Sequence, residues 1–236
     1  MRAALNGTAD TASTDRSTLI VAGATLLYLA YHLIGKRFQG RWAPLYRRAF
    51  GAAVLGLVPL VLVTLAYRLP LSSWGLTLKD AGWSMAVAGV AWLGLLPILA
   101  LQARSPAFQA RYPELREPFT PSVAALNAGA WVAYLIGYEL FFRGILLLGL
   151  ADTLGPWLAL AIVTMGYVFV HLDKYAGEAV GTVFSGAAFG LAVLYSGSLL
   201  MPLLLHVLIA VSSDTLAARY LNFTSTRTRG VPSAGA

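Results

Sequence analysis

Long apolar stretches separated by short polar or basic segments make up most of the chain from residue 17 onward. A helix needs about 20 apolar residues to cross the roughly 30 Å hydrocarbon core of a bilayer. Seven stretches approach this length, at about 17–35, 49–67, 81–101, 122–149, 155–171, 180–196 and 198–217. None shows the apolar and polar alternation of a membrane β-barrel strand, so the pattern predicts an all-α, polytopic transmembrane helix bundle with about seven spans.

The composition agrees with a membrane protein and excludes several chemistries. Of the 236 residues, 58% are hydrophobic and 11% are charged, and the mean hydropathy of +0.70 lies outside the range of ordinary soluble domains. The chain contains no cysteine, so a thiol nucleophile, a disulfide and a thiolate metal site are excluded. We therefore expect an integral membrane protein whose chemistry rests on oxygen and nitrogen side chains.

The same pattern divides a single integrated membrane domain into four regions. Residues 1–16 are polar and rich in Thr and Ala, and we expect them to form a disordered tail. Three transmembrane helices and an interfacial segment occupy 17–121, and four prolines between 102 and 122 argue against a continuous helix there. A core of four helices follows at 122–217, and 218–236 is expected to be a cytoplasmic tail.

Basic residues lie mostly on one side of the predicted bundle. Lysine and arginine gather in the loops at 36–48 and 104–116 and in the C-terminal tail, and they are sparse elsewhere. Basic loops stay on the cytoplasmic side, so we expect the N-terminus outside and the C-terminus in the cytoplasm, in a bacterial inner (plasma) membrane. The net charge of +7 then reflects topology and attraction to the lipid bilayer, and it gives no reason to expect a nucleic acid partner.

Ionisable residues inside the last four spans are the candidates for function, because a charge costs several kcal/mol in hydrocarbon. Glu139 and Arg143 lie in the fourth span, His171 ends the fifth, and His206 lies in the seventh. Glu139 and Arg143 are either an ion pair within one helix that neutralises itself or part of a site. His32, in the first span, fits a hydrogen-bonded core residue.

Three segments carry a family resemblance: YELFFRG at 138–144, YVFVH at 167–171, and FSGAAFGLAVLYSGSLLMPLLLH at 184–206. Their order and spacing resemble the CPBP family of intramembrane proteases, which includes CAAX prenyl protease-like and bacteriocin-processing relatives. The resemblance covers about residues 122–217. It implies an integral membrane endopeptidase that cleaves peptide or membrane-anchored protein substrates with an activated water.

The family pattern begins with two glutamates, three residues and an arginine, and it ends with a histidine followed four residues later by Asn or Asp. Here Tyr138 stands at the first glutamate, Ala210 stands at the Asn or Asp, and Tyr167 replaces a phenylalanine of the second motif. The site residues implied by the resemblance are Tyr138, Glu139, Arg143, His171 and His206.

The change at Tyr138 leaves two readings open. In an active protease His171 would act as the base, His206 as the oxyanion donor, and Tyr138 as a donor or proton relay. Alternatively, the chain is a catalytically silent relative with a binding, immunity or regulatory role. A transporter agrees less well with the sequence, which shows no inverted halves. His171 ends its span whereas Glu139 lies in the middle of its own, which counts against convergence of the site. A tilted or longer fifth helix would remove this conflict.

Three further carboxylates lie near the histidines in the sequence. Asp173, Glu178 and Asp214 are either replacements for the missing glutamate or solvated charges at the interface. We expect no required metal, and the compact H-E-x-x-H signature is absent. If a divalent ion such as zinc is bound, its ligands would be His171, His206 and Glu139. The expected partner is a peptide or membrane-protein substrate, and the sequence sets no oligomeric state.

Overall fold

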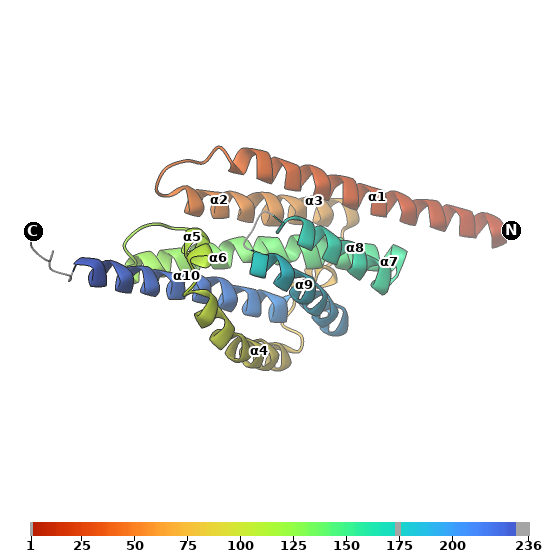
Figure 1. The fold of residues 1–236 in the computed structure, drawn as a ribbon. Coiled ribbons are helices and arrows are strands. Elements are labelled where there is room, and N and C mark those ends of the chain that lie inside the picture. The colour runs from red at the N-terminus through yellow and green to blue at the C-terminus, as the bar shows by residue number, and fades with distance from the viewer. Residues whose placement is uncertain (1, 173–175, 230–236) are drawn as a thin grey trace, which may run out of the picture.

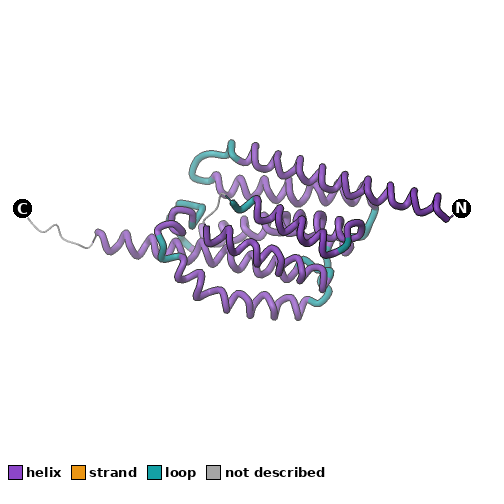
Figure 2. The backbone as a smooth tube through the Cα atoms, turned by 45° about the vertical axis from the view of Figure 1, so that its right-hand side comes forward, coloured by secondary structure: helices purple, strands orange, loops and turns teal. Residues whose placement is uncertain are grey.

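The structure, a computed structural model, describes residues 2–172 and 176–229 (Figures 1 and 2). In chain order the elements are α1 (Arg2–Gly35), α2 (Ala43–Gly51), η1 (Ala52–Leu57), α3 (Val58–Tyr67), η2 (Leu71–Trp74), α4 (Ala81–Gln102), α5 (Pro106–Arg111), α6 (Pro121–Glu139), η3 (Leu140–Leu148), α7 (Gly149–Leu154), α8 (Pro156–Phe169), α9 (Ala176–Ser196) and α10 (Leu200–Arg229). Two of these, η1 and η3, are π-helical and lie inside longer helices. Short connections join the helices (Figure 2), and the predicted all-α class is confirmed.

Five helical stretches among the described residues are long and apolar enough to cross a membrane. They are Arg16–Gly35, Ala43–Tyr67, Ala81–Gln102, Pro121–Leu154 and Leu200–Leu221. Two shorter apolar helices, Pro156–Phe169 and Val180–Ser196, lie where the fifth and sixth spans were predicted. The prediction of a transmembrane bundle with about seven spans is therefore confirmed. The two ends of the chain lie at opposite ends of the bundle (Figure 1), as an odd number of crossings requires.

The first and last helices of the chain extend further than expected. The first helix begins at Arg2, so residues 2–16 are helical where the sequence suggested a disordered tail. The last helix continues to Arg229, well into the expected tail at 218–236. Adding a residue to an existing helix fixes one residue for one hydrogen bond, whereas starting a helix is costly. The apolar spans supply the start, and the Ala-containing flanks extend it.

The helices lie in successive layers across the bundle. Helix α1 packs on the continuous helix formed by α2, η1 and α3, which packs on α6. On the far side of α6 lies α10, and α4 covers α10. The helix made of α6, η3 and α7 therefore runs through the middle of the molecule (Figure 1). Because this central helix carries the first motif, the motif lies in the interior of the bundle.

Two glycines let the central helix approach its neighbour. A Cβ atom added to Gly56 would lie 2.7 Å from the Cα atom of Gly137, a distance at which the backbones would have to separate. Small residues permit such close crossings in membranes, where helix association depends on packing more than on the hydrophobic effect. The crossing fixes α6 against η1 directly before the motif, which begins at Tyr138, and it thereby helps to position the motif.

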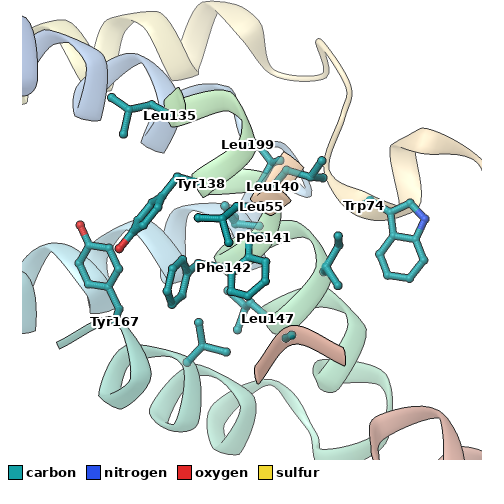
Figure 3. Close-up of a cluster of buried hydrophobic side chains, with 14 of the residues drawn as sticks. Leu55, Trp74, Leu135, Tyr138, Leu140, Phe141, Phe142, Leu147, Tyr167 and Leu199 are labelled. Atoms are coloured by element: carbon teal, nitrogen blue, oxygen red, sulfur yellow. The ribbon is translucent and has the colours of Figure 1, made fainter. Parts of the chain in front are cut away.

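A buried apolar cluster surrounds η3 (Figure 3). Its fully buried members include Leu140 and Leu147 from η3, Leu55 from η1 and Trp74 from η2. The rings of Tyr138 and Tyr167 lie side by side at the edge of this cluster, on the side away from Trp74 (Figure 3). The core therefore ends where the polar site begins.

The segment between α4 and α6 is not a continuous helix, as its prolines predicted. It contains only the short helix α5, whose N-cap Ser105 accepts a hydrogen bond from the backbone of Phe108 at 3.2 Å. Phe108 and Tyr112 pack on Ala217 of α10. The segment is therefore held against the end of the bundle where α10 continues toward the C-terminus.

Candidate active site

The first motif lies where the central helix changes from α to π geometry. Tyr138 and Glu139 are the last residues of α6, and η3 begins at Leu140. Neighbouring helical residues point about 100° apart, so the two side chains diverge. Tyr138 contacts the ring of Tyr167 on α8, whereas Glu139 reaches His206 on α10. π-helical turns inside α-helices are frequent at functional sites.

Glu139 connects Arg143 to His206. Its Oε1 atom lies 2.6 Å from Nδ1 of His206, and because a carboxylate only accepts hydrogen bonds, Nδ1 must donate. Its Oε2 atom lies 3.3 Å from Nη1 of Arg143. Glu139 is 0% exposed and Arg143 1% exposed, so neither charge is solvated by bulk water. The pair is therefore both a structural ion pair and the support of a histidine.

Aromatic rings complete the surroundings of Arg143. Its guanidinium carbon lies 4.1 Å from the ring centroid of Tyr167 and 5.4 Å from that of Phe189. A cation over an aromatic face is stabilised by the ring quadrupole, more strongly away from water. Because a tyrosine offers the same ring face as a phenylalanine, the departure at Tyr167 preserves this contact.

His171 reaches the site because α8 is short. Helix α8 starts at Pro156 directly after the central helix ends at Leu154, so the two run antiparallel about Gly155. His171 lies as many residues after Gly155 as Glu139 lies before it, and the two therefore reach similar depth. The expected tilt or lengthening of the fifth helix is not needed, since 14 residues of α8 rise only about 21 Å and end inside the bundle.

The ring of His171 is fixed by the end of α8, which it follows by two residues. Its Nδ1 atom lies 2.8 Å from the carbonyl oxygen of Tyr167. A carbonyl accepts, so Nδ1 carries a proton and Nε2 of the neutral ring carries the lone pair. The ring of Tyr167 also packs against the imidazole, with centroids 4.6 Å apart. Both contacts orient Nε2 for proton transfer.

Tyr138 lies between the two histidines. Its ring meets the imidazole of His171 at a centroid distance of 6.3 Å and that of His206 at 5.8 Å, both edge to face. The hydroxyl of Tyr138 is buried and has no hydrogen-bond partner among the described residues. An unpaired buried hydroxyl is costly, so the Tyr138 hydroxyl is a group that a bound molecule would satisfy.

A cavity of about 2000 Å³ opens beside these residues, and Tyr138, His171 and His206 line it. Glu139 and Arg143 are not among the lining residues. The structure thus brings all five predicted site residues together. Tyr138, His171 and His206 face the cavity, and the ion pair of Glu139 and Arg143 lies behind His206. A bound molecule would touch the phenol and the imidazoles and not the ion pair.

Asp214 does not belong to this site, nor is it a solvated interfacial charge. It is 0% exposed, and its Oδ2 atom accepts hydrogen bonds from Trp131 at 2.7 Å and Asn127 at 2.8 Å. Arg48, read from the sequence as part of a basic surface loop, is 3% exposed and donates to Asn127 at 2.6 Å. It also contacts Glu114 at 3.1 Å. The network was missed because its members come from four distant segments.

The other two candidate carboxylates are Glu178 and Asp173. Glu178, at the start of α9, accepts a hydrogen bond from the hydroxyl of Tyr112 at 2.7 Å. Burial, and then the Glu178 carboxylate, raise the pKa of Tyr112 well above its ordinary value. Asp173 lies outside the described residues. Neither carboxylate is therefore shown to replace the missing glutamate.

The described residues show no three-ligand metal site. No group of three or more His, Cys, Asp or Glu side chains with suitable geometry occurs in the part of the chain that the structure describes. Both oxygens of Glu139 face cationic or donor groups, one His206 and the other Arg143. His171, His206 and Glu139, the residues that would hold a divalent ion if one were bound, are therefore arranged for hydrogen bonding in this structure.

The motifs resemble those of the CPBP-type intramembrane proteases, and the all-α membrane bundle agrees with that resemblance. Residues 120–212 match the model of the family described as type II CAAX prenyl endopeptidase, Rce1-like, and the match confirms the resemblance. No curated protein and no solved structure matches the chain. The matched segment begins at the start of α6 and ends inside α10, so α1 to α5 lie outside it.

Proposed function

We propose that this chain is an integral membrane endopeptidase that hydrolyses a peptide bond in a peptide or membrane-anchored protein, and that it works without the family's first glutamate. One observation carries the proposal. The remaining carboxylate, Glu139, holds Nδ1 of His206 at 2.6 Å, while Tyr138 and His171 face the same cavity. The site thus keeps a base, two donors and an orienting carboxylate.

His171 acts as the general base. With its Nδ1 proton donated to the Tyr167 carbonyl, the Nε2 lone pair takes a proton from water as the water oxygen attacks the substrate carbonyl carbon. The same proton later passes from His171 to the leaving amine when the carbon–nitrogen bond breaks. One histidine therefore serves as base and then as acid, and the proton count balances.

Tyr138 and His206 stabilise the oxyanion that forms on the attacked carbonyl. The Tyr138 hydroxyl, which has no other partner among the described residues, donates one hydrogen bond. Protonated His206 donates a second from Nε2, and the Glu139 carboxylate then forms an ion pair with the imidazolium. Donors aimed at developing charge are typically worth about 10²–10³-fold in rate each.

Glu139 and Arg143 are positioning residues in this mechanism. They lie behind His206 and do not line the cavity, so neither touches the substrate. The Arg143 cation keeps Glu139 charged through their contact at 3.3 Å, and Glu139 fixes which nitrogen of His206 faces the cavity. This is the usual role of a second residue that orients a catalytic histidine.

We further propose that the chain lies in a bacterial inner membrane with its N-terminus outside and its C-terminus in the cytoplasm. The charge bias of the loops supports this orientation. Basic residues that line the cavity, Lys36 and Arg47 among them, belong to the loop assigned to the cytoplasmic side. In this orientation the cavity receives substrate from the cytoplasm or from the bilayer.

The test measures cleavage by the purified chain in lipid nanodiscs, with a peptide library read by mass spectrometry. We expect His171→Ala and His206→Ala each to lower cleavage at least about 10²-fold. His32→Ala is the matched control. His32 is the remaining histidine of the chain and lines the same cavity, but its ring stacks on Tyr28 of α1 and it makes no contact with Glu139 or Tyr138 among those that the structure describes. Cleavage that persists in the double variant would contradict the proposal.

A silent relative gives a different result. The wild-type chain would cleave nothing, and Tyr138→Glu, which restores the family carboxylate, could create activity in the intact cavity. In an enzyme that works through Tyr138, the same substitution should lower cleavage, because it replaces a donor by an anion next to the developing oxyanion. The sign of the Tyr138→Glu effect therefore separates the two cases.

A further inference from the structure

An apolar groove runs between α1 and α8 and belongs to the same cavity. Helix α1 forms one wall, α8 forms the other, and the continuous η3 and α7 form the floor with Phe142, Leu146 and Leu150. The ring centroid of Phe142 lies 6.5 Å from that of Tyr28 on α1 and 5.7 Å from that of Tyr167 on α8. Figure 3 shows Phe142 and Tyr167 side by side. The two walls therefore flank the central helix at the same depth.

The groove opens sideways toward the bilayer. Its lining residues recur three or four positions apart on both walls, so each wall presents one face of its helix. They include Val21, Thr25 and Leu29 on α1 and Ile162, Gly166 and Phe169 on α8. Although both line the cavity, Leu29 is 48% exposed and Phe169 is 76% exposed. Because α1 lies outside the segment that matches the family, nothing in the family match assigns a role to this opening.

Two cations lie at the end of the groove that the proposed orientation places on the cytoplasmic side. Lys36 and Arg47 are both exposed, and both line the cavity. Phe50, one turn after Arg47 on α2, contacts the rings of Tyr31 and Phe38. Those two rings precede and follow Lys36 in the sequence, so the two cations lie at one level of the bundle.

The acidic residues that line the cavity are engaged elsewhere. Glu114 forms an ion pair with the buried Arg48 at 3.1 Å, and Glu178 accepts a hydrogen bond from the hydroxyl of Tyr112 at 2.7 Å. The two cations of the groove, by contrast, form no ion pair with a described residue. Their positive charge therefore remains for an anionic ligand.

The groove is long enough for an acyl chain. From Val21 to Lys36, which directly follows α1, the helix rises about 22 Å. One leaflet contributes about half of the roughly 30 Å hydrocarbon core. A chain whose headgroup lies at Lys36 thus extends past Leu29 and ends inside the groove.

An apolar groove that ends at two cations matches the two parts of an anionic phospholipid. A lysine or arginine near the membrane surface favours an anionic headgroup by about 5-fold, and basic sites between transmembrane helices on the cytoplasmic side bind phosphate-bearing headgroups. We propose that the groove binds one anionic glycerophospholipid of the inner leaflet, with its phosphate between Lys36 and Arg47 and an acyl chain along Leu29 and Phe169. The lipid is a bound component and not a substrate, and it closes the side of the cavity beside the candidate active site. The leaflet follows from the proposed orientation, whereas the binding does not depend on cleavage.

Photo-cross-linking in nanodiscs tests the site with the unmodified full chain. The host lipid is phosphatidylcholine, and the probe is a trace of phosphatidylglycerol or phosphatidylcholine that carries the same diazirine-bearing acyl chain. Cross-linked residues are located by mass spectrometry of peptides. Leu26 and Leu33 are the internal control, because they are 67% and 56% exposed on the same helix and do not line the cavity.

We expect cross-links to Leu29 and Phe169 to favour phosphatidylglycerol by about 5- to 25-fold, since two cations contribute about 5-fold each. Leu26 and Leu33 should react equally with both lipids. Equal reaction of both lipids in the groove would mean ordinary bilayer lipid, and the same preference at all four positions would mean general attraction to the basic loops. Displacement by an equal amount of glycerol phosphate would assign the cations to a soluble anion. Each of these three results would overturn the proposal.

Charge substitutions test the headgroup contacts. Lys36→Gln and Arg47→Gln should each lower the preference for phosphatidylglycerol in the groove by about 5-fold. Arg37→Gln is the matched control, because Arg37 is exposed in the same loop and does not line the cavity. An unchanged preference in the double variant of Lys36 and Arg47, or an equal loss in Arg37→Gln, would contradict a specific headgroup site.

A bulky substitution tests the place of the acyl chain. Leu29→Trp fills the groove, so cross-links from phosphatidylglycerol to Phe169 should be lost, whereas Leu33→Trp adds the same bulk outside the cavity and should leave them unchanged. Cross-links to Phe169 that persist in Leu29→Trp would place the chain elsewhere and overturn the proposal. None of these measurements requires cleavage. Failure of the lipid site would therefore leave the proposed endopeptidase untouched, and an inactive chain would leave the lipid site standing.

Discussion

Replacing Glu139 by Gln should both destabilise the bundle and abolish cleavage, for two separate reasons. The carboxylate lies 3.3 Å from Arg143 and 2.6 Å from His206. Glutamine has the same shape as glutamate, so the substitution removes only the charge. It therefore leaves a buried guanidinium without its counter-ion, and it leaves the histidine without an anionic partner.

The stability loss follows from the burial of Arg143. Its side chain is 1% exposed, and removing one partner of a buried pair typically costs about 3–5 kcal/mol. For a chain of this size such a cost lowers the melting temperature by about 6–20 °C. The Tyr167 ring, 4.1 Å from the guanidinium, still stabilises the cation, so we expect a value toward the lower end.

The activity loss follows from the role of His206. In the Glu139→Gln variant the side-chain amide can still accept a hydrogen bond from Nδ1, but it cannot balance the charge of the imidazolium that donates to the oxyanion. Losing the carboxylate that orients and charges a catalytic histidine typically lowers kcat by about 10²–10⁴-fold. We expect a similar loss here with a small change in KM, because Glu139 does not line the cavity.

A second substitution separates the two effects. In the variant Glu139→Gln with Arg143→Met both charges are gone, and replacing a buried pair by uncharged groups is often neutral for stability. Thermal unfolding followed by tryptophan fluorescence, with six tryptophans in the chain, should show the melting temperature recover while cleavage stays lost. If cleavage returned together with stability, Glu139 would be only a structural partner, and the proposed mechanism would be refuted.

Three further predictions follow from the same geometry. Tyr138→Phe should lower kcat about 10- to 100-fold in the peptide cleavage assay by removing one donor, and an unchanged rate would remove Tyr138 from the mechanism. Reporters fused after Thr226 and within the loop 69–79 should read cytoplasmic and external respectively, and the opposite pattern would reject the orientation. Gly56→Ala should destabilise the bundle by about 1–3 kcal/mol in thermal unfolding, because its Cβ would lie 2.7 Å from Gly137; an unshifted transition would contradict the close crossing.

The apolar pattern located the helices well because hydropathy is a local property and the bilayer sets a fixed length. The third span, predicted at 81–101, is α4 (Ala81–Gln102), and the sixth, predicted at 180–196, ends with α9 at Ser196. The tails were less predictable. Residues 2–16 are helical because a helix that has formed in the neighbouring span is easily extended into them. Their polar composition alone does not reveal this extension.

The motifs identified the residues of the candidate site but not how they are connected. Spacing alone could not show whether Glu139 pairs only with Arg143 or also supports His206, because the second contact joins α6 to α10. The depth of His171 likewise depends on the hairpin of α8 with the central helix. Such contacts depend on crossing angles and on the glycines that allow close approach, which one-dimensional spacing does not contain.

The sequence by itself determined that this is an all-α membrane protein, where its helices lie, and which histidines to examine. Only the tertiary structure determined which of the other charged side chains are buried and which partners they have. From the sequence, Asp214 was either a replacement for the missing glutamate or a solvated charge, and Arg48 belonged to a basic loop. In the structure both are buried in one network with Asn127. A charge can lie inside a bundle only where partners from distant segments meet it, since the desolvation cost must be offset by several hydrogen bonds. That meeting is fixed by packing, and packing is a property of the whole chain.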